Sequence, residues 1–95
     1  MLNQLVVVGR LVNNPIENGE EVSITLAVQR PFKNQEGEYE VDFIPFTLRM
    51  GIAEQTKEYC KKGDLVGIKG RISRNNDRLE LIAEKVTFLA NKKGE

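Results

Sequence analysis

Residues 39–50 place aromatic, hydroxyl and basic side chains at alternating positions, a spacing that suits contact with a flat, charged ligand. Alternate residues of a strand share a face, so Phe43, Thr47 and Arg49 would lie on one side of this segment. The other parity is apolar and is expected to face a core: Ile44, Phe46 and Leu48. An exposed aromatic ring can stack on a nucleobase for about 1–3 kcal/mol. The pattern therefore marks Phe43 as a candidate base-stacking residue.

A second segment, 65–74, repeats this alternation with basic side chains. Lys69, Arg71 and Ser73 share one parity and would supply phosphate contacts beside Phe43. The other parity is apolar and is expected to be core: Val66, Ile68 and Ile72. Simpler roles stay open for several of these residues. Phe43 could pack under a loop or in a subunit contact, and Arg74 could be one of the solvated charges that flank a turn.

Enzymatic chemistry finds little support in the residue types. The chain has no histidine and one cysteine, Cys60, so a Ser–His or Cys–His pair and a thiolate zinc site are excluded. Its glycines lack the spacing of a phosphate-binding loop. We expect a non-catalytic protein without a cofactor or metal, in which Tyr59 and Cys60 belong to the core face of a helix.

The 14 basic and 14 acidic residues cancel, but they are unevenly distributed. Residues 11–42 carry a net charge of −5 and residues 43–79 a net charge of +4. A polarised molecule of this kind can bind a polyanion at zero net charge. The lone cysteine, the lack of a signal-like N-terminus and the lack of a long apolar run favour a cytoplasmic protein without a membrane role.

Periodicity predicts one domain over residues 1–90, followed by a short polar end at 91–95. Period-two patterns predict five strands and a period-3.6 pattern predicts one helix, in this order: strands 2–12, 22–29 and 39–50, helix 52–62, and strands 65–74 and 78–89. A helix between the third and fourth strands is typical of the all-β, five-stranded OB-fold barrel. An SH3-like barrel would not need this helix.

Three local features refine these elements. Leu5 to Val8 is apolar in both parities, which indicates a strand covered on both faces. Pro45 lacks an N–H and favours a bulge, an edge position or a splayed region. Gly63 is expected to cap the helix in a left-handed conformation.

Four segments, taken in order, resemble bacterial single-stranded DNA-binding proteins. They are VVVGRLVNNP (6–15), ITLAVQRPFKNQEGE (24–38), DFIPF (42–46) and AEQTKEYCKKGDLVGIKGRI (53–72). The resemblance extends over roughly residues 1–89. It implies largely sequence-independent binding of single-stranded DNA in replication, recombination or repair.

The resemblance also assigns site residues. Phe32 matches the first stacking aromatic of the family and Phe43 the second, while Arg49 stands where a third would be and could stack through its guanidinium group. In that family basic side chains track the phosphates, and we expect six cations of this chain to supply electrostatic contacts: Arg10, Arg30, Lys33, Lys69, Arg71 and Arg74. The hairpin between the last two strands is short and its turn holds no aromatic residue, so less DNA should be wrapped per subunit.

By the same resemblance, the chain should form homo-oligomers in the bacterial cytosol or nucleoid, with dimers built through the first strand and further assembly to tetramers. The acidic tail through which the family recruits enzymes has no counterpart in this sequence. Two alternatives remain: a short primosomal relative of the same fold that acts in replication restart, and an OB-fold protein-interaction module that binds DNA weakly.

Overall fold

The computed structural model describes residues 1–91 and contains six strands and one helix. In chain order these are β1 (Leu5–Leu11), β2 (Ile16–Asn18), β3 (Glu21–Lys33), β4 (Tyr39–Arg49), α1 (Met50–Tyr59), β5 (Leu65–Asn75) and β6 (Arg78–Ala90). Residues 92–95 of the predicted polar end lie outside the described part. No helix within residues 1–91 is long and apolar enough to cross a membrane.

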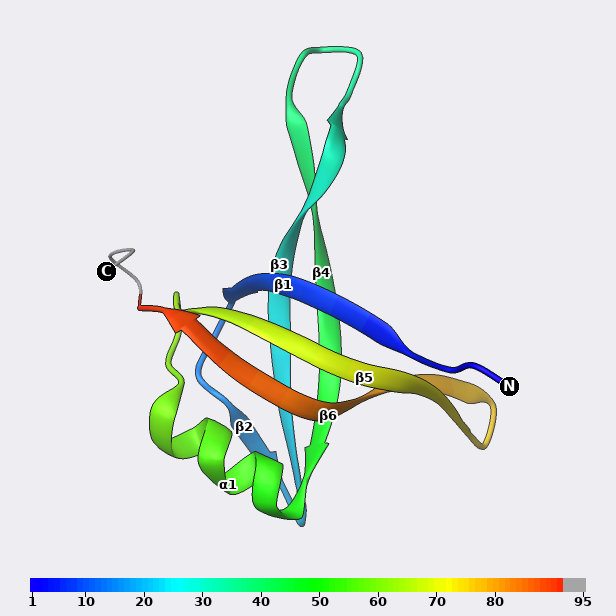
Figure 1. Cartoon of the computed structure of the whole chain (residues 1–95), viewed down its shortest axis with the longest axis vertical. Helices are drawn as coiled ribbons and strands as arrows, with labels where there is room; N and C mark the ends of the chain where they lie inside the picture. The colour runs from blue at the N-terminus through cyan, green and yellow to red at the C-terminus, as the bar shows by residue number, and fades with distance from the viewer. Residues whose placement is uncertain (92–95) are drawn as a thin grey trace.

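Five of the strands close into a barrel. The sheet order is β1-β5-β6-β4-β3-β2, and β1 also pairs with β3 through Arg10↔Ala27 and Leu11↔Leu26. This second pairing joins the ends of the sheet, as Figure 1 shows where β1 crosses β3. Helix α1, which connects β4 to β5 in the chain, lies below the barrel (Figure 1). The predicted barrel with its single helix is confirmed. The three-residue β2, which pairs with the start of β3, was not predicted.

The barrel core comes from the parities that the sequence indicated for β3 and β4. The largest fully buried side chains are Phe46, Ile24, Leu26, Leu48, Ile68 and Val66. Ile72, expected on the same side of β5, is instead exposed. It lies near the end of the β5–β6 hairpin, opposite Leu81, where the two strands extend past the barrel (Figure 1).

The helix begins and ends earlier than its pattern predicted. It buries a narrow stripe, with Ala53, Thr56 and Cys60 facing the barrel. The prediction for Cys60 is confirmed and that for Tyr59 is wrong, because the Tyr59 side chain is 65% exposed. At the helical pitch, Tyr59 lies roughly 100° from the centre of this stripe.

Gly63 has the expected positive φ of 92° but does not cap the helix. Cys60, in an extended conformation, is the C-cap, and its N–H bonds the carbonyl of Thr56. Gly63 belongs to the following turn, in which a carboxylate oxygen of buried Asp64 accepts the Lys61 N–H at 2.8 Å.

Pro45 occupies an open edge of β4. Its partner Thr25 turns its carbonyl toward β1, where it accepts the N–H of Val12 at 2.9 Å. The Thr25↔Pro45 pair is therefore not hydrogen-bonded and loses no bond to the missing N–H. On its other side, β4 pairs with β6 at one position, Thr47↔Ile82.

Within a single chain, strand β1 is covered on one face, so the expectation that both faces are covered is met for that face only, and a partner chain would have to cover the other. Val6 is 68% and Val8 49% exposed, while Leu5 and Val7 pack against the core. Within this chain the outward side chains of β1 are left open to solvent.

Candidate nucleic-acid interface

The longest surface feature is the β3–β4 hairpin, whose outer part extends well beyond the barrel as an arm (Figure 1). The two strands stay in register from Glu21↔Arg49 to Gln29↔Val41, and a shift then precedes Lys33↔Tyr39. Alternate residues of a strand share a face, and so do opposed residues of a pair. One side of β4 therefore carries Val41, Phe43, Thr47 and Arg49. We call this side, together with the β3 residues opposite them, the outward face of the hairpin.

Phe43 lies in the middle of this outward face and is 66% exposed. Its partner Ala27 also pairs with Arg10 of β1, so Arg10, Ala27 and Phe43 form one row across three strands. At the spacing of neighbouring strands, the backbones of Arg10 and Phe43 are about 10 Å apart. The structure thus brings Arg10 and Phe43 onto one surface.

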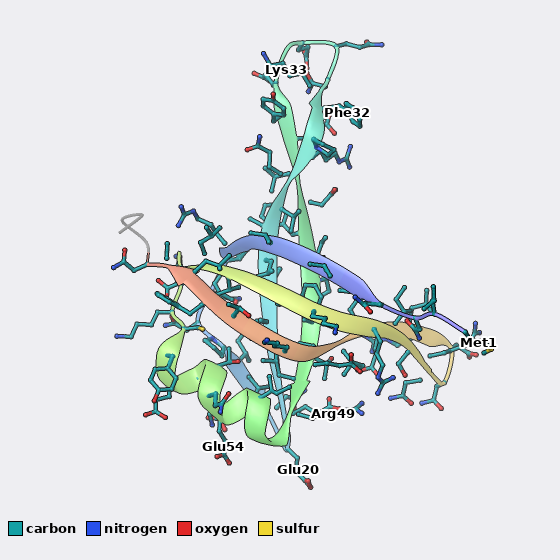
Figure 2. The ribbon with its side chains drawn as sticks, in the orientation of Figure 1. Met1, Glu20, Phe32, Lys33, Arg49 and Glu54 are labelled. Atoms are coloured by element: carbon teal, nitrogen blue, oxygen red, sulfur yellow. The ribbon has the colours of Figure 1, made fainter. Side chains whose placement is uncertain are left out.

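Phe32 lies near the tip of the arm and is 80% exposed. It borders an open hollow of about 500 Å³ together with Arg30, Lys33 and Asn34. Figure 2 shows Phe32 and Lys33 near this tip and Arg49 at the opposite end of the hairpin. Arg49 lies six residue steps along the strand from Phe43, which corresponds to about 20 Å. The three predicted stacking residues are therefore spread along the whole hairpin.

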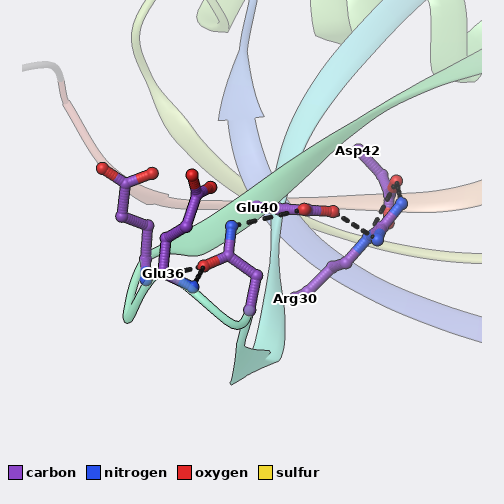
Figure 3. A network of polar contacts seen from close by, with 6 residues as sticks. Arg30, Glu36, Glu40 and Asp42 are labelled. Atoms are coloured by element: carbon purple, nitrogen blue, oxygen red, sulfur yellow. Dashed lines mark hydrogen bonds and ion pairs between the residues drawn. The ribbon is translucent and has the colours of Figure 1, made fainter.

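The cations on the arm already have partners. The Arg30 guanidinium bonds Glu40 at 2.6 Å and Asp42 at 2.9 Å (Figure 3). The hydrogen bond that Arg30 donates to Asp42 holds the pKa of Asp42 below its usual value, and the same bond raises the pKa of Arg30. The Lys33 ammonium lies 5.7 Å from the centroid of the Tyr39 ring, within the range of a cation–π contact.

Arg49 stands between two carboxylates at the junction of β4 and α1. Its Nε lies 3.5 Å from an oxygen of Glu21, and its Nη2 lies 3.9 Å from an oxygen of Glu80. The guanidinium is about half exposed. It can accept a new partner from solvent, but that partner would compete with both carboxylates.

On the barrel, Arg71 and Lys69 lie apart from Phe43. Arg71 pairs with Ile82 in the sheet and forms an ion pair with Glu84 at 3.2 Å. Lys69 lies between Val6 of β1 and Lys85 of β6. Strand β5 is separated from β4 by β6, so the expectation that these cations flank Phe43 directly is wrong.

The remaining cations contact nearby backbone. Arg74, on the β5–β6 hairpin, donates to the Asn76 carbonyl at 3.3 Å and lies 3.9 Å from Asp77. Arg10 donates to the Gly63 carbonyl at 3.0 Å and to the Asn91 carbonyl at 3.5 Å. Both groups stay exposed.

Sequence reasoning missed Tyr39 and the acidic partners of the arginines. Tyr39 has the parity of Val41 and Phe43 and is exposed, so the alternation already pointed to it. The partners Glu40, Asp42 and Glu84 gave no such signal, because pairing them with arginines requires the register of the hairpins.

Neither cysteine chemistry nor a catalytic cluster emerges from the described residues. Burial, and secondarily the charge of Asp64, raise the pKa of the Cys60 thiol. A buried thiol with a raised pKa is a poor nucleophile.

The sequence matches a known protein family over nearly its whole length. The model of the single-strand binding protein family matches residues 2–89. The chain belongs to the single-strand binding protein family. This family is non-catalytic, in agreement with the expectation that the chain is not an enzyme.

Its relatives in this family include bacterial single-stranded DNA-binding proteins. The chain is 45% identical over 103 residues to the single-stranded DNA-binding protein of Halalkalibacterium halodurans, covering 94% of this chain and 61% of that protein. It is 41% identical over 109 residues to single-stranded DNA-binding protein B of Bacillus subtilis, covering 100% of this chain and 96% of that protein. It thus spans less than two thirds of the first relative and nearly all of the second.

The fold matches a solved structure of the same kind. The mitochondrial single-stranded DNA-binding protein Rim1 of Saccharomyces cerevisiae superposes with a TM-score of 0.76 at 20% identity, covering 96% of this chain and 99% of that one. At this identity the match supports the fold alone, and it agrees with the predicted OB-fold barrel.

Proposed function

We propose that this chain binds single-stranded DNA without strong sequence preference, by laying bases on the outward face of the β3–β4 hairpin and phosphates on the basic side chains around it. The observation that carries the proposal is the exposure of Phe32 and Phe43 on a fold of the single-strand binding protein family. Large exposed aromatics are costly in water, and every base offers them a π-face.

The roles divide by residue type. Phe32 and Phe43 stack bases, and Arg49 takes the third stacking position at the base of the hairpin. The electrostatic contacts come from the other predicted cations: Arg10, Arg30, Lys33, Lys69, Arg71 and Arg74. Lys69 and Arg71 lie on β5. A single strand of DNA that reaches them must therefore pass from the hairpin across the barrel.

The ion pairs limit the electrostatic part of the binding energy. Arg30, Arg49, Arg71 and Arg74 each face at least one carboxylate. A phosphate that displaces a carboxylate from an arginine contributes less binding free energy than a phosphate that meets an unpaired cation. The displaced carboxylate must then take up a cation from solution. We therefore expect a shallower salt dependence than the number of basic residues would give.

Assembly and location belong to the same proposal. The chain forms homo-oligomers through the outward face of β1, as dimers that can associate further to tetramers. It acts in the bacterial cytosol or nucleoid, in replication, recombination or repair. The bacterial relatives support this setting.

A titration of labelled oligo-dT tests the proposal. Fluorescence anisotropy of a 35-mer at low salt should show binding at micromolar protein or below, and the affinity should fall as salt rises. A double-stranded oligonucleotide of equal length serves as the control and should bind more weakly. No change in anisotropy at micromolar protein and low salt would contradict the proposal.

A further inference from the structure

A notch of about 330 Å³ lies at the base of the hairpin, between the outward face of β3 and β4 and the start of β6. Six of its lining residues matter here: Ser23, Pro45, Thr47, Leu79, Glu80 and Leu81. The proline and leucines give apolar walls, and the serine and threonine carry hydroxyl groups. Its volume is at the lower end of the range for small-molecule sites.

Glu80 is the unusual member of this lining. Its side chain is 19% exposed, whereas Glu21 and Glu84 are close to half exposed. One carboxylate oxygen, Oε1, is buried without a hydrogen-bond partner. The Nη2 of Arg49 lies 3.9 Å away, close enough for attraction but too far for a hydrogen bond.

A buried acceptor without a donor is rare, because folded proteins satisfy nearly all such groups. The carboxylate can turn about its terminal torsion, which has broad minima, and can therefore present an oxygen to a donor that enters the notch. Glu80 thus offers a strong, charged acceptor on a surface where we propose that DNA binds.

The chemistry of DNA restricts which donor can fill this role. Phosphates and the deoxyriboses within a strand offer acceptors only, so the donors of single-stranded DNA are on its bases. Cytosine, adenine and guanine carry exocyclic amino groups, and a glutamate that accepts from the cytosine amino group is a known base-reading contact. The single N–H of thymine lies between two carbonyl oxygens, which would repel the carboxylate.

We propose that this notch holds one nucleobase and that Glu80 makes it favour bases with an exocyclic amino group over thymine. The inference rests on the proposed function and adds a modest base preference to it. Arg49 does not line the notch, but its Nη2 lies 3.9 Å from Oε1 of Glu80, so the guanidinium borders the carboxylate that contacts the base.

Competitive titrations with dC35 and dT35 test this inference, at one salt concentration and at pH 8, where cytosine is unprotonated. The two strands differ in stiffness and self-stacking, so the informative quantity is the change in their affinity ratio between variants. Glu80→Gln removes the charge and adds an amide donor suited to thymine carbonyls. It should shift the ratio toward dT35 by about fivefold or more, as one base-edge contact gives.

The matched control is Glu84→Gln on the same strand. Glu84 also pairs with an arginine, at 3.2 Å, but it does not line the notch. Its loss of charge should raise both affinities together and leave their ratio unchanged. Thermal unfolding of both variants checks that the fold is retained.

Each outcome decides the question. An unchanged ratio in Glu80→Gln, or an equal shift in Glu84→Gln, overturns the base preference while the proposed function stands. If the unaltered protein binds neither oligonucleotide, the proposed function and this inference fall together.

Discussion

Aromatic and basic side chains carry different parts of the proposed binding energy. Phe43 offers a ring with no charge, and Arg71 offers a charge on a different strand. Stacking depends weakly on salt, whereas phosphate contacts release counterions. The two contributions can therefore be separated by measuring affinity over a range of salt concentrations.

Phe43→Ala should weaken oligo-dT binding by about 1–3 kcal/mol with little change in the slope of log affinity against log salt. Arg71→Ala should instead lower the magnitude of this slope by up to about 0.7, the value for one phosphate contact on a single strand. Anisotropy titrations at four salt concentrations measure both effects. The reverse pattern would show that the roles are assigned wrongly.

The Arg30–Asp42 pair gives a prediction about pH. Because Arg30 lowers the pKa of Asp42 in the folded chain, the stability from this pair is fully present above the ordinary carboxyl pKa of about 3.9. It is lost as the pH falls through the lowered value. Arg30→Gln should return the pKa of Asp42 to its ordinary range, as measured by carboxyl-carbon NMR titration.

Lys33→Gln is the control for this titration. Lys33 is also on the arm, but its described contact is with the Tyr39 ring and it does not pair with Asp42. This variant should leave the Asp42 titration unchanged. An Asp42 pKa that stays low in Arg30→Gln would mean that another group stabilises the carboxylate.

Strand parity predicted much at the level of single elements, because one face of each strand packs against the barrel core. It placed Phe46 and Leu48 inside and Phe43 outside. It failed where an element extends past the core, as at Ile72, or where a helix buries only a narrow stripe, as at Tyr59. Alternation records polarity along the chain, and it contains no information on how far the neighbouring elements reach.

The register of the strand pairs could not be predicted from the sequence pattern for the same reason. The shift between Gln29 and Lys33, and the shift of β6 against Lys69 and Gly70, decide which charges meet. Parity alone placed Lys69 and Arg71 beside Phe43. The strand order instead puts β6 between them.

The register shift beside Gly70 makes this glycine a structural requirement of the barrel. A Cβ on Gly70 would lie 2.2 Å from the Ile82 carbonyl oxygen, which is backbone and cannot move aside cheaply. Gly70→Ala should therefore destabilise the fold by at least about 1–3 kcal/mol. Chemical denaturation followed by circular dichroism measures this change.

Gly51 in α1 provides the contrast. A Cβ there would meet no atom within 4 Å, and alanine is favoured over glycine in a helix by about 1 kcal/mol. Gly51→Ala should leave stability unchanged or raise it. Equal loss of stability in both variants would show that the close approach at Gly70 is not what matters.

On the scale of the whole molecule, the closed barrel leaves apolar side chains uncovered on the outward face of β1. A Cβ added at Gly67 would lie 3.7 Å from both the Val8 and the Leu89 side chains, so these residues surround one small area. Val6 and Leu89 are also exposed. Contiguous apolar patches on a soluble protein commonly mark protein contacts, which supports the proposed assembly through β1.

Val8→Glu should therefore dissociate the oligomer. In a two-fold contact each subunit would bury one added carboxylate, and the two like charges would lie close together. Size-exclusion chromatography with light scattering should show the mass fall toward the 10.8 kDa of one chain. Ile16→Glu is the matched control, since Ile16 is similarly exposed (51%, against 49% for Val8) but lies on β2. It should leave the mass unchanged. If the oligomer persists in Val8→Glu, the contact between subunits must lie on another face. If Val8→Glu is monomeric and still binds oligo-dT, the hairpin binds DNA without the partner subunit.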